Sequence, residues 1–185
     1  METSCNGADR GPGRFVVKRA SNDDLPEAAA VQAVCFREIG TGVVPDEILA
    51  DVTGPRTVHS TIEQWADLLE DGAEIWILED RLDMRTVGVV MAKVSNSPDA
   101  PTPWEVATMH VLPEARTCGA SDELLTRAIG DKPAFLWVFQ DNARAISFYR
   151  RHGFEVDDTE GSRDDSLGGI ELQRLVRPAA EGQQD

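Results

Sequence analysis

The sequence predicts a single α/β domain in which helices flank a mixed sheet, and three observations lead to this fold class. The strand-like segments Glu74–Glu79 and Thr86–Val94 flank a charged turn, as they would in an antiparallel hairpin. The nearly continuous apolar run Ala134–Phe139 is typical of a central strand that is covered on both faces. A helical pattern at Asp122–Ile129 separates this strand from the strand-like Trp104–Leu112, which indicates a strand–helix–strand unit.

The N-terminal part is expected to hold one strand and two helices. Phe15–Arg19 predicts a short first strand, and the capping residues of Ser21–Asp24 introduce a helix that runs from Leu25 to Phe36. The segment Gly40–Pro55 is rich in turn formers. Thr61–Asp71 has apolar residues at helical spacing and predicts the second helix.

The C-terminal part continues the sheet after a loop, Ser95–Pro103, that contains three prolines. Asn142–His152 predicts a short helix, and Glu171–Val176 predicts the last strand after the acidic loop Asp157–Gly169. The chain of 185 residues has the length of one domain, which we place at residues 14–178. Residues 1–13 and 179–185 are small and polar, so we expect them to be flexible tails.

Composition narrows the function classes. The net charge of −15 argues against a nucleic acid partner, because phosphate binding needs a basic surface. The acidity either keeps the protein soluble or attracts cationic, amine-bearing molecules. No apolar run reaches the roughly 18 residues of a membrane span, and no signal peptide is visible, so we expect no membrane partner.

The cysteines and histidines carry little information on chemistry. The three cysteines, Cys5, Cys35 and Cys118, form no Cys-x-x-Cys pair, which favours reduced thiols and a cytoplasmic location. The three histidines are scattered without metal-ligand spacing, so no metal is expected.

The segment Val111–Ser121 runs from a strand end into a helix start. Backbone N–H groups at such a turn point outward at the positive end of the helix dipole and can bind phosphate oxygens. Gly119 permits a close backbone approach, and Arg116 can add a charge-assisted contact. The alternative is a plain strand-to-helix turn, in which Asp122 and Glu123 are ordinary dipole partners.

A second informative segment follows the central strand. Asn142 suits a helix N-cap, and Gly153 suits a left-handed C-terminal residue. The order Asn142-x-x-Ala145-x-x-Phe148-Tyr149-x-x-x-Gly153-Phe154 resembles the second acetyl-CoA motif of the GNAT superfamily of N-acetyltransferases. Upstream, Pro113-x-x-Arg116-x-x-Gly119-x-Ser121 is similar to the pyrophosphate loop of that superfamily, with Thr117 in place of a common glycine and Ser121 in place of glycine or alanine.

The resemblance implies a GNAT-like acyl-CoA N-acyltransferase fold, with a mostly antiparallel central sheet, a splayed parallel strand pair and flanking helices. Acetyl-CoA is then expected in the V-shaped opening between Trp104–Leu112 and Ala134–Phe139. Backbone groups would pair with the pantetheine arm, and the loop amides would cradle the pyrophosphate. The cofactor-binding residues implied by the resemblance are Met109, His110, Val111, Arg116, Thr117, Cys118, Gly119, Ala120, Ser121, Asn142, Ala145 and Phe148.

The chemistry that the resemblance implies is direct attack of a primary amine on the thioester. Tyr149, the only tyrosine, matches the general acid of the family; the alternative is a helix aromatic that packs on the sheet. Glu105 is the candidate base, because strand alternation places it on the face of Met109 and Val111 if no bulge intervenes. The alternative is that Glu105 is merely exposed at the strand edge. The base would then be His110, which alternation places on the opposite face, or a chain of water molecules that carries the proton to solvent.

Other readings of the site remain open. Cys118 beside a helix N-terminus could act as a thiolate, or it could be a tolerated small residue of the loop. A non-catalytic domain of the same fold that binds CoA or a protein is the alternative to an enzyme. The resemblance also places the pocket for the acceptor amine, which is a small molecule or a peptide, between the segments Glu38–Arg56 and Asp157–Gly169. It is compatible with a monomer or a homodimer. The acids of these segments would form a solvated face or a mouth that attracts cations: Glu38, Asp46, Glu47, Asp51, Asp157, Asp158, Glu160, Asp164 and Asp165.

Overall fold

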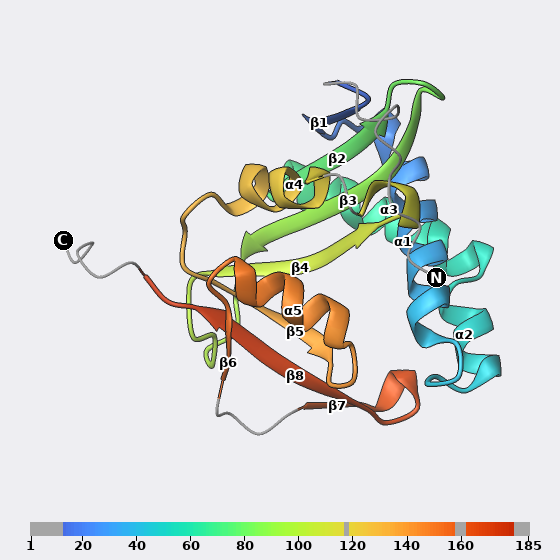
Figure 1. The fold of residues 1–185 in the computed structure, drawn as a ribbon. Coiled ribbons are helices and arrows are strands. Elements are labelled where there is room, and N and C mark those ends of the chain that lie inside the picture. Colours follow the sequence, from blue (N-terminus) through green and yellow to red (C-terminus); the bar gives the residue numbers. More distant parts are fainter. Residues whose placement is uncertain (1–12, 117–118, 158–161, 180–185) are drawn as a thin grey trace.

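The computed structural model describes residues 13–116, 119–157 and 162–179, and these residues form one sheet with helices on both faces (Figure 1). The strands follow the order β1-β2-β3-β4-β5-β8-β6, and β7 pairs with β8 outside this path. The predicted mixed α/β sheet is thereby confirmed. The bounds of the strands are β1 Phe15–Arg19, β2 Glu74–Asp80, β3 Arg85–Val94, β4 Trp104–Val111, β5 Ala134–Phe139, β6 Glu155–Val156, β7 Ser162–Asp164 and β8 Ile170–Arg177.

Only one pair of neighbouring strands in the described sheet is parallel, namely β4 and β5. Their register holds at two positions, Trp104 opposite Ala134 and Glu105 opposite Phe135, and the strands then part. This is the splayed parallel pair that the resemblance implied. It leaves the backbone edge of β4 beyond Glu105 facing an opening rather than a strand.

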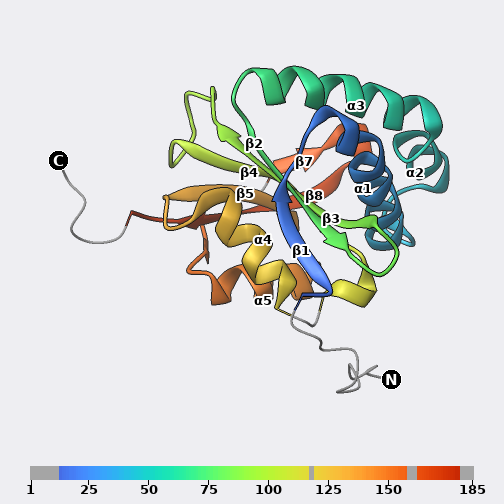
Figure 2. The same ribbon diagram turned by 90° about the horizontal axis from the view of Figure 1, so that it is seen from above.

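Five α-helices in the described ranges cover the two faces. Figure 2 shows α1 (Leu25–Gly40), α2 (Asp46–Val52) and α3 (Pro55–Glu70) on one side of the sheet, and α4 (Ala120–Ile129) and α5 (Ala143–Arg151) on the other. Each face of the sheet has its own hydrophobic core, and the side chains of consecutive strand residues point into opposite cores. On β3, Val89 packs in the layer under α1 and α3, whereas its neighbour Val90 packs in the layer under α4.

Two segments of the first half differ from what the sequence indicated. The segment Gly40–Pro55 contains α2, whose Leu49 is buried. A helix of seven residues with a single buried apolar residue gives a weak periodic signal. The second helix begins at Pro55 rather than Thr61, because proline is well suited to the first helical position after the Gly54 cap.

The C-terminal segment holds two short strands that the sequence did not indicate. β6 and β7 both pair with β8, and they contain two and three residues. A 3₁₀ turn, η3 (Asp165–Leu167), links β7 to β8. The expected tails lie largely outside the described residues, and none of the described helices has the length and apolar character needed to cross a membrane.

Candidate active site

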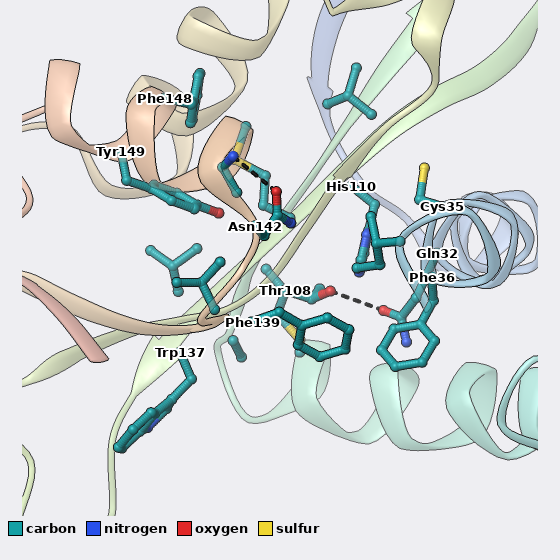
Figure 3. A pocket seen from close by; sticks show the side chains of 18 of the residues that line it. Gln32, Cys35, Phe36, Thr108, His110, Trp137, Phe139, Asn142, Phe148 and Tyr149 are labelled. Carbon is teal, nitrogen blue, oxygen red and sulfur yellow. Dashed lines mark hydrogen bonds between the residues drawn. The ribbon is translucent and has the colours of Figure 1, made fainter. Parts of the chain in front are cut away.

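A cavity of about 690 Å³ lies where β4 and β5 part, and it has two walls (Figure 3). The α4–α5 wall consists of the lining residues on α4 and α5 and of the strand residues that face them: Met109, Val111, Ser121, Val138, Asn142, Arg144, Ala145, Phe148, Tyr149 and Arg151. The α1–α3 wall faces the other side of the sheet and includes Gln32, Cys35, Phe36, Ile39, Gln64, Trp65, Leu68, Met91, Lys93, Thr108, His110, Trp137, Phe139, Leu167 and Leu172. The cavity therefore connects the two faces of the sheet through the strand opening.

Tyr149 belongs both to the core and to the cavity. Its side chain is 8% exposed, and its ring makes edge contacts with Phe148 and Phe154 at centroid distances of 5.2 and 5.6 Å. Figure 3 shows its hydroxyl directed toward Asn142 and the cavity, and it makes no hydrogen bond with another described residue. Burial raises the pKa of Tyr149, so the phenol stays protonated and can donate a proton.

Asn142 forms the N-terminal cap of α5. Its side-chain oxygen accepts a hydrogen bond from the backbone N–H of Ala145 at 3.1 Å, as the sequence predicted for a cap. The cap leaves the side-chain NH₂ group as a donor in the cavity wall. Ala145 and Phe148 line the same wall, so the structure brings these three predicted cofactor residues together with Tyr149.

The predicted phosphate loop is a helix N-terminus in the structure. Gly119 caps α4 with a φ of +75°, a conformation that favours glycine. The backbone N–H groups of the first helical turn, including those of Ala120 and Ser121, have no partner within the helix. Ser121 lines the cavity, whereas the side chain of Ala120 packs in the core, so Ala120 can contribute only its backbone. Thr117 and Cys118 lie outside the described residues.

Arg116 is not free to make the charge-assisted phosphate contact that the sequence suggested. Its guanidinium donates to the Glu38 carboxylate at 2.7 and 2.6 Å, and its Nε donates to the Val111 carbonyl at 2.6 Å. Its backbone N–H donates to the Pro113 carbonyl at 3.3 Å, within the 3₁₀ turn η2 (Pro113–Ala115). The residue lines the mouth of the cavity, but its donors already have acceptors.

A bulge on β4 changes the placement of Glu105. Ala92 pairs with Val106 and the next β3 residue, Met91, pairs with Thr108, so Ala107 is an extra residue on β4. The bulge reverses the alternation and places Glu105 on the face of Thr108 rather than that of Met109 and Val111. The expectation of a shared face with Met109 and Val111 was therefore wrong.

Glu105 also stands apart from the cavity. It is absent from the lining residues, and its carboxylate lies 3.8 Å from the amine of Lys93, which does line the α1–α3 wall. It pairs with Phe135 at the closed end of the strand opening. Any contact between Glu105 and an acceptor in the cavity therefore requires an intervening group.

His110 lies in the α1–α3 wall beside a hydrogen-bonded pair. Thr108 Oγ1 donates to Gln32 Oε1 at 3.0 Å, which ties β4 to α1 (Figure 3). Burial lowers the pKa of His110 to about 4, and the positive charge of Arg116 acts in the same direction. The imidazole is therefore neutral at neutral pH.

The acids that would form either a solvated face or a mouth that attracts cations lie away from the cavity lining where they are described. No aspartate or glutamate among the described residues lines the cavity. Glu38 binds Arg116, Asp51 lies 3.5 Å from Arg56, and Asp157 binds Arg174. Asp46 and Glu47 occupy the first turn of α2, and Asp164 caps η3; Asp158 and Glu160 lie outside the described residues.

Sequence reasoning missed most of the α1–α3 wall. Of the described residues in the two segments expected to shape the acceptor pocket, only Ile39 and Leu167 line this cavity. Gln32 and Phe36 stand four residues apart on the predicted first helix, a spacing that indicates a shared face but not what that face contacts. The described residues contain no group of three or more His, Cys, Asp or Glu side chains that could hold a metal ion.

Comparisons with known proteins agree with this geometry. Residues 71–156 match the family described as the acetyltransferase (GNAT) domain. A "probable N-acetyltransferase" of Mycobacterium tuberculosis is 25% identical over 151 residues, which cover 79% of this chain and 83% of the relative.

Solved structures establish the likeness of the fold. The PaiA N-acetyltransferase of Thermoplasma acidophilum, in complex with coenzyme A, has a TM-score of 0.64 at 17% identity and covers 86% of this chain and 97% of its own. A GNAT superfamily phosphinothricin acetyltransferase of Sinorhizobium meliloti, in complex with acetyl-CoA, has a TM-score of 0.63 at 17% identity. The match covers 92% of this chain and 91% of the Sinorhizobium chain. The domain model that matches residues 71–156, the N-acetyltransferase relative and the sheet that opens between β4 and β5 together support a GNAT N-acetyltransferase.

Proposed function

We propose that the protein transfers an acetyl group from acetyl-CoA to a primary amine by direct attack, without a covalent enzyme intermediate. The observation that carries this proposal is the cavity through the β4–β5 opening, which joins the two faces of the sheet. Acetyl-CoA would enter along the α4–α5 wall, and the amine would approach from the α1–α3 wall. The two reactants would then meet at the opening.

Three features of the α4–α5 side suit acetyl-CoA. The edge of β4 near Met109–Val111 faces the opening without a strand, so its backbone groups can pair with the pantetheine amides. The free amides of Gly119–Ser121, at the N-terminus of the ten-residue α4, would receive the pyrophosphate. Arg144 and Arg151 line the same wall and supply positive charge in an acidic protein. Bound CoA in the Thermoplasma relative and bound acetyl-CoA in the Sinorhizobium relative support this choice of co-substrate.

The amine lone pair forms a bond to the thioester carbonyl carbon, and the carbon–sulfur bond then breaks. The departing thiolate takes the hydroxyl proton of Tyr149, which faces the cavity. The amine loses one proton, and Tyr149 recovers its proton from solvent. The products are the N-acetyl amine and CoA.

The proton of the amine needs an acceptor. We assign this role to Glu105 acting through water, because the bulge places it on the acceptor face and the carboxylate lies outside the cavity wall. His110 is the alternative, since it lies in the wall itself and is neutral.

A calorimetric titration with acetyl-CoA, followed by a thiol-release assay with a panel of amines, tests this function. We expect acetyl-CoA binding and amine-dependent release of CoA. The alternative is a non-catalytic CoA-binding domain, which the sequence departures at Thr117 and Ser121 favour. Binding without release for any amine would support that alternative. The buried and unpaired Cys35 supports a reducing compartment such as the cytoplasm.

A further inference from the structure

The acceptor side of the cavity is mostly apolar, and its described lining contains no carboxylate. Aromatic and aliphatic side chains from α1, α3, β5, η3 and β8 dominate the α1–α3 wall: Phe36, Ile39, Trp65, Leu68, Phe139, Leu167 and Leu172. Phe36 and Phe139 meet edge to face at 5.8 Å. Among the described residues of this wall Lys93 is the only charged side chain, and it is a cation.

A second cavity of about 200 Å³ adjoins this wall, and we refer to it as the annex. It shares Gln32, Phe36 and Leu167 with the main cavity. The rest of its lining comes from α1, α2 and α3: Ala29, Ala33, Val52, Thr57, Val58 and Thr61. Its described lining contains no charged side chain, so the apolar character of the acceptor side extends away from the strand opening.

We infer that the acceptor is a monoamine carried on an aromatic or branched-aliphatic body, with its far end in the annex. The inference rests on the proposed function, since it names the amine that the α1–α3 wall would admit. A second ammonium group, as in a polyamine, would lose its hydration here without a carboxylate in the described lining to pair with, since Glu105 lies outside the lining and beside Lys93. Burial of an unpaired charge is costly. The net charge of −15 therefore does not describe the acceptor site.

The same wall favours the reactive form of a monoamine. An apolar surrounding disfavours the charged ammonium and so lowers the pKa of a bound amine, whereas a nearby carboxylate would raise it. A deprotonated amine is the form that can attack the thioester. The burial that shifts the His110 pKa downward acts on the same side of the opening. Specificity for apolar monoamines and ease of deprotonation thus have one physical cause.

A panel of amines tests the inference through thiol release. The apolar members are 4-phenylbutylamine and isoamylamine, and the charged members are putrescine and spermidine. We expect kcat/KM, expressed per concentration of free base, to be at least about tenfold higher for the apolar members, because each apolar group placed in a fitting pocket contributes on that scale. Transfer to none of the apolar amines, or faster transfer to the polyamines, overturns the inference.

Two variants test the annex directly. Ala33→Phe places a ring among its lining residues, so it should raise KM for 4-phenylbutylamine at least about tenfold and change it little for isobutylamine. Val34→Phe is the matched control, because Val34 is the next residue of α1, is 57% exposed and lines neither cavity. Equal KM changes for the long and short amines would contradict an acceptor tail in the annex.

Gln32→Glu keeps the test decisive if Ala33→Phe does not fold. Its carboxylate retains an oxygen acceptor for Thr108 and adds one negative charge that faces both cavities. The ratio of kcat/KM for putrescine to that for 4-phenylbutylamine should rise about tenfold; an unchanged ratio would contradict the charge argument. A failure of the inference is distinguishable from a failure of the proposed function, because only the latter abolishes CoA release with every amine, whether or not acetyl-CoA binds.

Discussion

Arg116 and Glu38 form a two-point ion pair at the mouth of the cavity, with Nη1–Oε1 and Nη2–Oε2 distances of 2.7 and 2.6 Å. The pair joins the loop after β4 to α1, and Arg144 of α5 lies 3.6 Å from the same carboxylate. The two hydrogen bonds from Arg116 hold the pKa of Glu38 below its usual value, so the carboxylate is charged. One negative group therefore neutralises part of the positive charge near the proposed pyrophosphate site.

Glu38→Gln should strengthen acetyl-CoA binding. The change removes the negative charge and leaves the guanidinium groups of Arg116 and Arg144 available to an anionic ligand. We expect Kd to fall about two- to fivefold at low ionic strength, the scale of a partly exposed charge pair, and the gain to fade in high salt. Titration calorimetry at two salt concentrations measures both effects.

Glu47→Gln is the control for the change in net charge. Glu47 is exposed on α2 and lines neither cavity. An equal gain in affinity in this variant would show that the whole charge of the protein, and not the Glu38 pair, sets acetyl-CoA affinity.

Gly119→Ala tests the helix N-terminus as the pyrophosphate site. A Cβ at Gly119 meets no atom within 4 Å, so the cost of the change is backbone strain at a φ of +75°. Relaxation of that strain should misplace the first-turn amides and raise Kd for acetyl-CoA at least about tenfold, since several charge-assisted hydrogen bonds depend on them. Gly42→Ala is matched, with a φ of +79° and open space around its Cβ, and should lower stability equally without changing Kd.

The sequence predicted the elements of the site whose local residue pattern is distinctive. The apolar run of β5 and the Asn142 cap predict the strand and the start of α5, and both stand within one residue of the predicted positions. The splayed strand pair followed from the resemblance alone. The bulge at Ala107 could not be predicted, because an extra strand residue leaves no mark in a sequence when its partner strand is unknown.

The acceptor wall was hidden for a different reason. Phe36, Trp65 and Phe139 look like ordinary core residues in their own elements, and only the tertiary fold brings them to one cavity. The acidic segments were a misleading signal, since acids such as Asp51 form local surface pairs. Net charge therefore describes the surface of this chain and not its cavity.

Glu105→Gln should lower turnover mainly at the acid end of the pH profile. There the free amine is scarcest, so loss of a base acting through water has its largest effect, within the range of about 10²–10⁴-fold for general-base loss. The ion pair with Lys93 is lost at the same time, so acetyl-CoA affinity is measured alongside kcat/KM. A pH–rate profile identical to that of the wild type would transfer the role to His110 or to solvent.

Tyr149→Phe should lower kcat by roughly 10–10³-fold with little change in acetyl-CoA affinity. The hydroxyl makes no hydrogen bond with another described residue, so its removal should also leave the thermal unfolding midpoint nearly unchanged. Because burial raises the pKa of Tyr149, activity should not fall from loss of this proton as pH rises through the usual range of a phenol near 10. Phe148→Leu is a control for disturbed packing, since it alters the same wall without touching the hydroxyl. Full turnover per folded molecule in Tyr149→Phe would leave the residue as a core aromatic only.

His110 should make the fold sensitive to acid. Its pKa falls from 6.5 in the unfolded chain to about 4 in the folded protein, so the unfolded state binds the proton more tightly. The stability contributed by neutral His110 is therefore complete above pH 6.5 and is lost as pH falls from 6.5 toward 4. We expect the free energy of unfolding to fall between pH 7 and pH 5 by about 1–2 kcal/mol more in the wild type than in His110→Gln. His59→Gln, at an exposed histidine of α3, should retain the wild-type dependence; an equal fall in His110→Gln would show that His110 is not the source.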